Sequence, residues 1–291
     1  MKPMNFFSYP IDIMKHMNEK IAVITVLYEN YIILPDFLNS FKKQASDNFH
    51  IFLVDLSINK RKIKLPSLVT LLPSINKGYA YGINLGIKEA LSKQFSRFCV
   101  INSDIYVASN FIESISESLD KHPSSLIGGK IYYASGYEYH KKRYAQKDLG
   151  KVLWYAGGIN DWDNCLTKHR GVDEVDIGKY DICEETDFIT GCLMCFDASV
   201  VSQIGLWNES YFLYFEDTEY CERAKRANIA LYFDPNIILW HKNAQSTKGS
   251  GSELHQMYQK KNQLRFGLKY APLKTRLHLL KNYALTFFNL K

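Results

Sequence analysis

Short apolar runs that end in polar residues constrain the fold most strongly. The runs are IAVITVLY (21–28), HIFLVDLS (50–57) and RFCVINSD (97–104), and they are typical of parallel strands that are covered on both faces. Helix signals lie between them, with Pro35 at the start of DFLNSFKKQ and a helical pattern within 78–93. The alternation of strands and helices predicts an α/β fold with a mostly parallel central sheet flanked by helices.

The rest of the chain continues this pattern with less regularity. Asn110 and Glu113 resemble a capping box that opens a helix, and Ser210 is a candidate start for the helix that contains FEDTEYC. Residues 134–185 have no clear assignment apart from one strand candidate, and the Gly/Ser-rich stretch 243–252 indicates a mobile lid. Further strands are predicted at 68–72, 126–133, 152–158, 187–196, 229–234 and 237–242.

Composition excludes several classes of protein. The chain has 291 residues, 46% of them hydrophobic and 23% charged, as in an ordinary soluble globular protein. Its apolar runs are shorter than the ~20 residues needed to cross a bilayer, and no signal peptide is evident, so a cytoplasmic location is expected. The six cysteines are scattered. Cys192 and Cys195 lie in the predicted strand 187–196, with no second pair for a zinc site, so both should be buried structural residues.

The positive charge is concentrated near the C-terminus. Residues 256–291 contain eight Lys or Arg and no Asp or Glu, which exceeds the net charge of +6 for the whole chain. We therefore divide the chain into a body, 1–255, and a basic helical extension, 256–291, broken around Pro272. A basic amphipathic segment tends to lie at an anionic membrane surface, and we expect this of 270–291. Packing of the extension on the body is the alternative, and no motif indicates a nucleic-acid partner.

Polar residues follow the predicted strands at their carboxyl ends, where open α/β sheets bind ligands. Glu29 follows the first strand, Asp55 ends the second, and Asn102-Ser103-Asp104 end the fourth. A strand-end carboxylate such as Asp104 is suited to a divalent cation, with phosphate oxygens as further ligands. His241, which ends a later strand, is a candidate second ligand. Taken singly, each residue could also be an ordinary loop residue.

The stretch FLYFEDTEYC (212–221) places Glu216 and Asp217 directly after four apolar or aromatic residues. Burying a carboxylate is costly unless it is paired, metal-bound or catalytic. Acidic residues in the first turn of a helix are the structural alternative, because they gain ~0.3–1 kcal/mol from the helix dipole. The stretch alone does not separate these two interpretations.

Four stretches together resemble glycosyltransferase family 2, whose inverting members have the GT-A fold, and within it the bacterial rhamnosyltransferase-like group. NKGYAYGINLGI (76–87) looks like the family's Gly-rich loop, and INSD (101–104) is similar to its metal-binding D-x-D region. Residues 189–229 match the acceptor-side block, and LWHK (239–242) fits the late metal-ligating histidine. The sequence departs from the family pattern at Asn102, where the family often has Asp, and at DLSINK after the second strand.

The resemblance implies a role for each candidate residue. The second acid of the pair, Asp217, would be the catalytic base, with Glu216 as a supporting neighbour. Asp104 and His241 would hold Mg²⁺ or Mn²⁺. The residues implied in donor binding are Thr25, Glu29, Asp55, Lys77, Gly78, Asn84, Asn102, Ser103 and Asp104.

The function implied is inverting transfer of a sugar from a nucleotide-sugar donor to a hydroxyl of a bacterial surface polysaccharide, such as O-antigen, or of its lipid-linked precursor. The resemblance favours dTDP-L-rhamnose as donor, with a UDP-hexose as the competitor, and a peripheral location on the inner face of the cytoplasmic membrane. A sugar nucleotidyltransferase would need an early Arg/Gly-rich triphosphate loop, which the sequence lacks. A catalytically silent glycan-binding protein would not need Asp104, Asp217 and His241.

Overall fold

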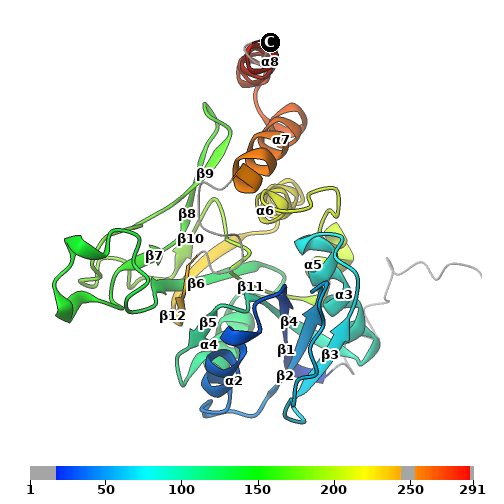
Figure 1. Ribbon diagram of the computed structural model, residues 1–291, viewed down its shortest axis with the longest axis vertical. Helices are drawn as coiled ribbons and strands as arrows, with labels where there is room; N and C mark the ends of the chain where they lie inside the picture. The colour runs from blue at the N-terminus through cyan, green and yellow to red at the C-terminus, as the bar shows by residue number, and fades with distance from the viewer. Residues whose placement is uncertain (1–17, 244–252, 289–291) are drawn as a thin grey trace, which may run out of the picture.

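The protein is built on one mixed sheet whose strands mostly point the same way (Figure 1). The structure, a computed structural model, describes residues 18–243 and 253–288. The strands of this sheet are β1 (Asn18–Leu27), β2 (Phe49–Asp55), β3 (Val69–Pro73), β4 (Phe95–Asn102), β5 (Ile105–Val107), β6 (Leu126–Tyr133), β7 (Leu153–Tyr155), β10 (Glu184–Glu185), β11 (Leu193–Asp197) and β12 (Leu231–His241).

The strand order is β10-β12-β6-β11-β4-β1-β2-β3, with β5 beside β12 and β7 beside β6. Strand β1 is parallel to β2 and β4, β2 is parallel to β3, and β6 is parallel to β12. Strand β11 is antiparallel to both of its neighbours, β4 and β6. The predicted α/β fold with a mostly parallel sheet is therefore confirmed, although the short strands β5, β7 and β10 are, like β11, antiparallel to their neighbours.

Helices cover both faces of the sheet (Figure 1). Helices α2 and α4 meet on one face, where the Phe41 and Phe111 rings lie 6.2 Å apart, and α3 and α5 lie on the other. The helices are α2 (Leu34–Phe41), α3 (Tyr79–Ser92), α4 (Phe111–Lys121), α5 (Ala198–Ile204), α6 (Glu216–Arg226), α7 (Glu253–Tyr270) and α8 (Leu273–Phe288), with 3-10 turns η1 (Tyr31–Ile33), η2 (Lys141–Arg143) and η3 (Gln146–Asp148).

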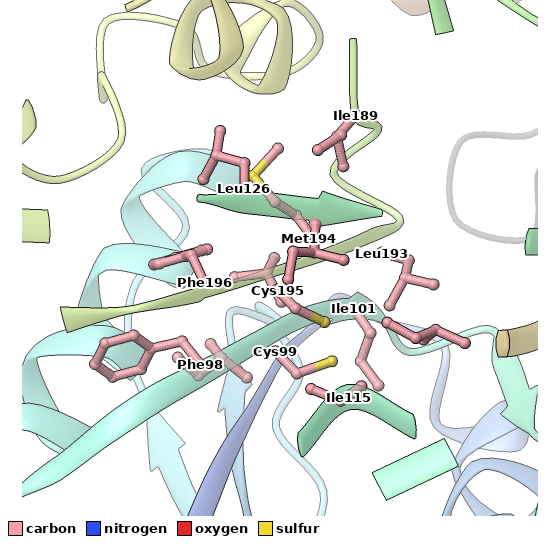
Figure 2. Packing of buried hydrophobic residues seen from close by; sticks show 14 of the residues in the cluster. Phe98, Cys99, Ile101, Ile115, Leu126, Ile189, Leu193, Met194, Cys195 and Phe196 are labelled. Atoms are coloured by element: carbon pink, nitrogen blue, oxygen red, sulfur yellow. The ribbon is translucent and has the colours of Figure 1, made fainter. Parts of the chain in front are cut away.

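The central strands form the core, as their continuous apolar sequences predict. Residues 21–24 of β1 are fully buried, because helices cover the sheet on both sides. Figure 2 shows the neighbouring strands β4 and β11, in whose register Cys195 lies opposite Cys99 and Phe196 opposite Phe98. Both cysteines, like Cys192, are buried and free, in agreement with the structural role predicted for Cys192 and Cys195.

The predicted strand at 187–196 is wrong in its first half, because regular structure begins at Leu193. The chain makes a turn before it, in which the Leu193 amide donates to the Thr190 carbonyl at 3.1 Å. The Cys192 amide donates to the Thr190 hydroxyl at 3.3 Å. Cys192 therefore precedes the strand, and the turn frees the amide of Gly191 for a contact in the site.

Two other local predictions also need correction. Helix α4 begins as expected, but Asn110 makes no capping hydrogen bond with its side chain; its amide instead donates to the Ser114 hydroxyl at 3.2 Å. The predicted strands 229–234 and 237–242 are one strand, β12, whose register shifts between Asp234 and Ile238. Pro235 lies within this irregular stretch and has no amide hydrogen to donate to a sheet.

The unassigned segment 134–185 folds around short strands. It contains the hairpin β8 (Gly158–Asp161) and β9 (Leu166–His169) together with β7. It is tied to the sheet by the buried Lys130, whose ammonium lies 2.9 Å from the Asp176 carboxylate. The predicted lid falls almost wholly on 244–252, outside the described residues.

The C-terminal helices α7 and α8 break around Pro272, as predicted. No helix in the described part of the chain is both long enough and apolar enough to span a bilayer. The division of the chain at residue 255 stays a prediction.

Candidate active site

A cavity of about 670 Å³ opens where the carboxyl ends of β1 and β4 meet the start of α6. The ends of β1 and β4, the turn at 190–193 and the hairpin β8–β9 contribute to it. The loop at 212–215, which we call the aromatic loop, also contributes. Its main lining residues are Val26, Tyr28, Gly78, Tyr79, Asn102, Ser103, Asp104, Trp154, Leu166, Thr167, His169, Phe188, Gly191, Phe212, Tyr214, Phe215, Glu216, Asp217, His241 and Tyr258. The cavity therefore contains both predicted metal ligands and both predicted catalytic carboxylates.

The two predicted metal ligands lie next to each other. Strand β12 pairs with β5 so that His241 faces Ile105, and this register brings His241 Nε2 to 3.2 Å from Asp104 Oδ1. Both side chains are buried, and His241 Nδ1 has no hydrogen-bond partner among the described residues. A carboxylate oxygen and an imidazole nitrogen suit Mg²⁺ or Mn²⁺.

The rest of the coordination would have to come from elsewhere. Within 18–243 and 253–288 there is no cluster of three or more His, Cys, Asp or Glu side chains that could hold a metal ion. A cation at Asp104 and His241 would leave positions for diphosphate oxygens and water, which are common partners of Mg²⁺. The residues present therefore fit a cation that is bound together with a nucleotide.

The two carboxylates of FEDTEYC begin helix α6. The helix starts at Glu216, not near Ser210 as predicted, because Tyr214 and Phe215 have left-handed backbone conformations with φ of 67° and 70°. These angles turn the aromatic residues into the cavity. Asp217 then accepts from the Gly191 amide at 2.8 Å and from the Thr218 amide at 2.7 Å.

Burial raises the pKa values of Glu216 and Asp217 to different degrees. It raises the pKa of Asp217, while hydrogen bonds from the Gly191 and Thr218 amides act against this rise. Burial, and then the nearby Asp217 charge, raise the pKa of Glu216 well above its ordinary value. Glu216 Oε2 has no hydrogen-bond partner among the described residues. Asp217 is therefore the carboxylate that the site supports better in its ionised form.

Comparison with known proteins decides the family. Residues 22–169, from β1 to β9, match the family described as Glycosyl transferase family 2. The chain belongs to this glycosyltransferase family.

Two individual proteins are also similar to this chain. A "Low-salt glycan biosynthesis hexosyltransferase Agl10" from Haloferax volcanii (strain DS2) is 28% identical over 158 residues, which are 53% of this chain and 45% of that protein. The chain thus matches less than half of the relative's length. The crystal structure of GalNAc-T7 with UDP, GalNAc and Mn²⁺ superposes with a TM-score of 0.65 and 17% identity, over 85% of this chain and 48% of that one. This likeness shows the GT-A fold.

Tyr79 links the two halves of the candidate site, and its position within NKGYAYGINLGI (76–87) does not by itself mark it as a site residue. Its hydroxyl lies 3.0 Å from the Gly191 carbonyl and 3.2 Å from Asn102 Oδ1. Asn102 Nδ2 is in turn 3.4 Å from His241 Nε2, and the Gly191 amide donates to Asp217. Polar contacts therefore run without a break from the proposed metal ligand to the proposed base.

The predicted donor residues at the first two strand ends are held by the protein itself. The Glu29 carboxylate accepts from the amides of Ile58 and Asn59 at 2.7 and 3.1 Å. Asp55 is buried and accepts from the Tyr31 hydroxyl at 2.7 Å and from the Ser57 amide at 3.0 Å. These carboxylates shape the loops after β1 and β2, and neither lines the cavity.

The structure places three further donor candidates outside the cavity lining. Thr25 is fully buried within β1, while Val26 and Tyr28 line the cavity instead. The Asn84 amide donates to the Trp207 carbonyl at 2.8 Å and accepts from the Trp207 amide at 2.9 Å, so it braces α3 against that loop. Lys77 lies over the Tyr81 ring, 5.2 Å from its centroid.

Gly78 and Ser103 do line the cavity. Gly78 has φ of +107°, and a Cβ there would come within 2.5 Å of the Phe212 carbonyl oxygen, so only glycine fits without strain. The Ser103 hydroxyl donates to the Val26 carbonyl at 3.0 Å. Gly78 therefore lets the start of α3 approach Phe212, and Ser103 ties the end of β4 to β1.

The segment without a predicted role supplies one wall of the cavity. The Trp154 ring lies between two imidazoles, with centroid distances of 4.4 Å to His169 and 4.7 Å to His241. His169 Nδ1 is 3.0 Å from the Trp154 carbonyl, and burial lowers the pKa of His169 to about 4. Leu166 and Thr167 complete this wall. Only contacts across the fold identify these residues.

Asn262 of α7 supports the aromatic loop from behind. It is buried, and its side-chain amide donates to the Leu213 and Tyr214 carbonyls, at 2.9 Å each. A non-glycine residue in the left-handed region costs roughly 1–2 kcal/mol, and these hydrogen bonds hold the turn through Tyr214 and Phe215. The position of the first turn of α6 therefore depends on α7.

Proposed function

We propose that this glycosyltransferase moves a hexose from a nucleotide-sugar donor to a hydroxyl of a glycan, with inversion at the anomeric carbon. The proposal rests on one observation above all: a single cavity holds the Asp104–His241 pair and Asp217, connected through Asn102, Tyr79 and Gly191.

In the proposed reaction, the acceptor oxygen attacks the anomeric carbon as the bond from that carbon to the diphosphate oxygen breaks. Asp217 takes the proton from the acceptor hydroxyl, and the nucleoside diphosphate leaves from the opposite face. One displacement of this kind inverts the centre. Mg²⁺ or Mn²⁺ held by Asp104 and His241 would neutralise charge on the departing diphosphate.

The donor is proposed to be either a UDP-hexose or dTDP-L-rhamnose. A UDP-hexose is supported by the name of the archaeal hexosyltransferase and by the UDP in the GalNAc-T7 crystal structure. The resemblance of the motifs to rhamnosyltransferases supports dTDP-L-rhamnose. The aromatic walls around Phe212, Phe215 and Trp154 suit stacking against sugar rings in either case. The acceptor is proposed to be a surface polysaccharide or its lipid-linked precursor.

A nucleotide-sugar panel tests the proposal. Thermal unfolding is followed with each donor in the presence of Mn²⁺, and a donor at 100 times its Kd should stabilise the protein by about 2.7 kcal/mol. The donor that stabilises is then supplied with candidate glycans, and proton NMR of the product reports the anomeric configuration. A retained configuration would contradict inversion, and binding without any transfer or donor hydrolysis would favour a silent glycan-binding protein.

A further inference from the structure

Helix α8 carries a row of exposed leucines. Leu273, Leu277 and Leu280 are 71%, 60% and 45% exposed. Their spacing of four and then three residues puts them on one face of the helix. Single apolar residues on a surface are ordinary, but several on one helix face mark a contact surface.

The opposite side of α8 is anchored to the body of the protein. The Thr275 hydroxyl donates to the Trp162 carbonyl at 2.9 Å, and both Thr275 and Leu279 are buried. Leu279 packs so closely on α7 that a Cβ at Gly267 would come within 2.2 Å of it. The leucine row therefore faces away from the fold, and it is not left exposed by loose packing of the whole helix.

Cations border the row on both sides. Lys274 and Lys281 are exposed and seven residues apart, so they share one flank of the leucines. Arg276 lies on the other flank, where its guanidinium also donates to the Ala271 carbonyl at 2.6 Å. The sequence of α8 contains no Asp or Glu. Leucines between cations are typical of a helix that lies in a lipid headgroup region, where lysine stems reach along the apolar face.

The leucine row also lies at the end of the molecule where the hairpin β8–β9 forms a wall of the cavity. Helix α7 contacts the hairpin β8–β9 through the stacked rings of Trp162 and Phe266, whose centroids are 5.8 Å apart. Leu166 and Thr167 of this hairpin line the cavity. In Figure 1 the hairpin, α7 and α8 lie together at one end of the molecule, away from β2 and β3.

We propose that the Leu273–Leu277–Leu280 face of α8 docks on an anionic lipid bilayer, with Lys274 and Lys281 against the headgroups. Docking would hold the cavity near a lipid-linked glycan, and only this consequence rests on the proposed function. The docking itself requires no sugar transfer, so the two can fail independently.

Co-sedimentation with vesicles tests the docking on the full chain. Vesicles of phosphatidylcholine with increasing phosphatidylglycerol, free of donor and acceptor, should pellet the wild-type protein more strongly as the anionic fraction rises. Changing Leu273, Leu277 and Leu280 together to Gln should weaken binding roughly tenfold or more, because their apolar area no longer leaves water. Lys274→Gln and Lys281→Gln should each weaken it about fivefold at low salt and reduce its salt dependence.

A matched control removes exposed apolar side chains elsewhere. Ile177 and Ile182 are 84% and 73% exposed in the segment before β10, and changing both to Gln should leave vesicle binding unchanged. Thermal unfolding of the leucine variant should match that of the wild type, since the changed side chains are exposed. Equal pelleting of wild type and leucine variant would overturn the proposal. The proposal would also be overturned if the wild-type protein did not bind vesicles but formed a concentration-dependent dimer in light scattering, and the leucine changes abolished that dimer.

Discussion

The two sides of the cavity are built in different ways. On the side proposed for the donor, Asn102 ends β4 and Ser103 and Asp104 follow it directly, so their positions are fixed by the sheet. On the side proposed for the acceptor, Trp154 and Phe212–Phe215 come from segments far apart in sequence, and Asn262 of α7 holds the loop at Leu213 and Tyr214. A rigid sheet suits binding of a diphosphate, which is common to many donors, whereas loop-built walls can vary with the acceptor.

From this contrast we expect variants on the two sides of the cavity to affect different steps. Changes at the Asp104–His241 pair should reduce nucleotide binding, while changes at the start of α6 or its supports should reduce transfer and leave nucleotide binding intact. Any variant that shows the reverse pattern would break the distinction between the two sides.

The largest effect is expected for Asp217→Asn. The substitution keeps the shape of the side chain and removes the base, so the transfer rate should fall by ~10²–10⁴-fold. Calorimetry should show nucleotide binding close to wild type, and thermal unfolding should change little. If the variant turns over at the wild-type rate, Asp217 is a structural residue at the start of α6, bonded to Gly191.

The next effect is expected for Asp104→Asn. Loss of the carboxylate charge beside His241 should weaken Mn²⁺-dependent nucleotide binding on the order of 10–100-fold, the range seen when groups that support a metal are altered. Calorimetric titration with nucleoside diphosphate, with and without Mn²⁺, measures this directly. Full activity in EDTA, or unchanged metal-dependent binding in the variant, would remove Asp104 from the metal site.

A smaller effect should follow from Asn262→Asp, which replaces two donors by acceptors facing the Leu213 and Tyr214 carbonyls. Leaving buried polar groups unsatisfied costs about 1–3 kcal/mol, measured by urea unfolding, and kcat should fall as the aromatic loop moves. The neighbouring Gln263→Glu is the matched control. Its side-chain amide donates at 2.8 Å to Asn164 of the hairpin, at an exposed position, so its loss should matter less to stability and to kcat. Equal losses in both variants would argue against a special role for Asn262.

The smallest effect is a dependence of stability on pH at Glu216. Burial raises its pKa in the folded state, so the folded protein binds the proton more tightly than the unfolded chain does. The associated stability is present below the ordinary Glu pKa and decreases as pH rises through the folded value. Glu216→Gln cannot ionise, so its melting temperature should gain on the wild type as pH increases across this range.

Glu219 in the same helix provides a control of opposite sign. Burial acts to raise its pKa, but Arg223, Tyr270 and Lys269 outweigh burial and lower it. Glu219→Gln should therefore lose stability relative to wild type at neutral pH, and this difference should shrink as pH falls through the folded value. Parallel pH profiles for the two variants would contradict the environments described for these carboxylates.

Sequence patterns predicted the sheet well, because buried parallel strands leave a local mark. The apolar runs of β1, β2 and β4 identify their strands and their carboxyl ends, and this places Asp104 at the correct edge. Helix α6 was also predictable, but its start was not, since the left-handed turn at Tyr214 and Phe215 depends on Asn262. The strand assigned before Leu193 failed for a similar reason, because Thr190 turns the chain through its own side chain.

The site itself was predictable only where a motif contains the residue. The resemblance singled out Asp217 and His241, and the structure brings both to one cavity. It also suggested Thr25 and Asn84, whose side chains are turned to the core and to Trp207. Tyr79 lies within the Gly-rich motif and Trp154 within a predicted strand, but neither pattern marks a site residue, since their roles come from contacts with strands and histidines that are distant in the chain.

The hydrogen bonds from Asn262 to the Leu213 and Tyr214 carbonyls also determine which part of the site can form first during synthesis. Translation produces the chain from the N-terminus, so β4, which Asp104 follows, and β12, which His241 ends, can assemble while later residues are still being added. The aromatic loop, which sets the start of α6, lacks its hydrogen bonds from Asn262 until α7 has left the ribosome. A nascent chain should therefore bind nucleotide before it can transfer sugar.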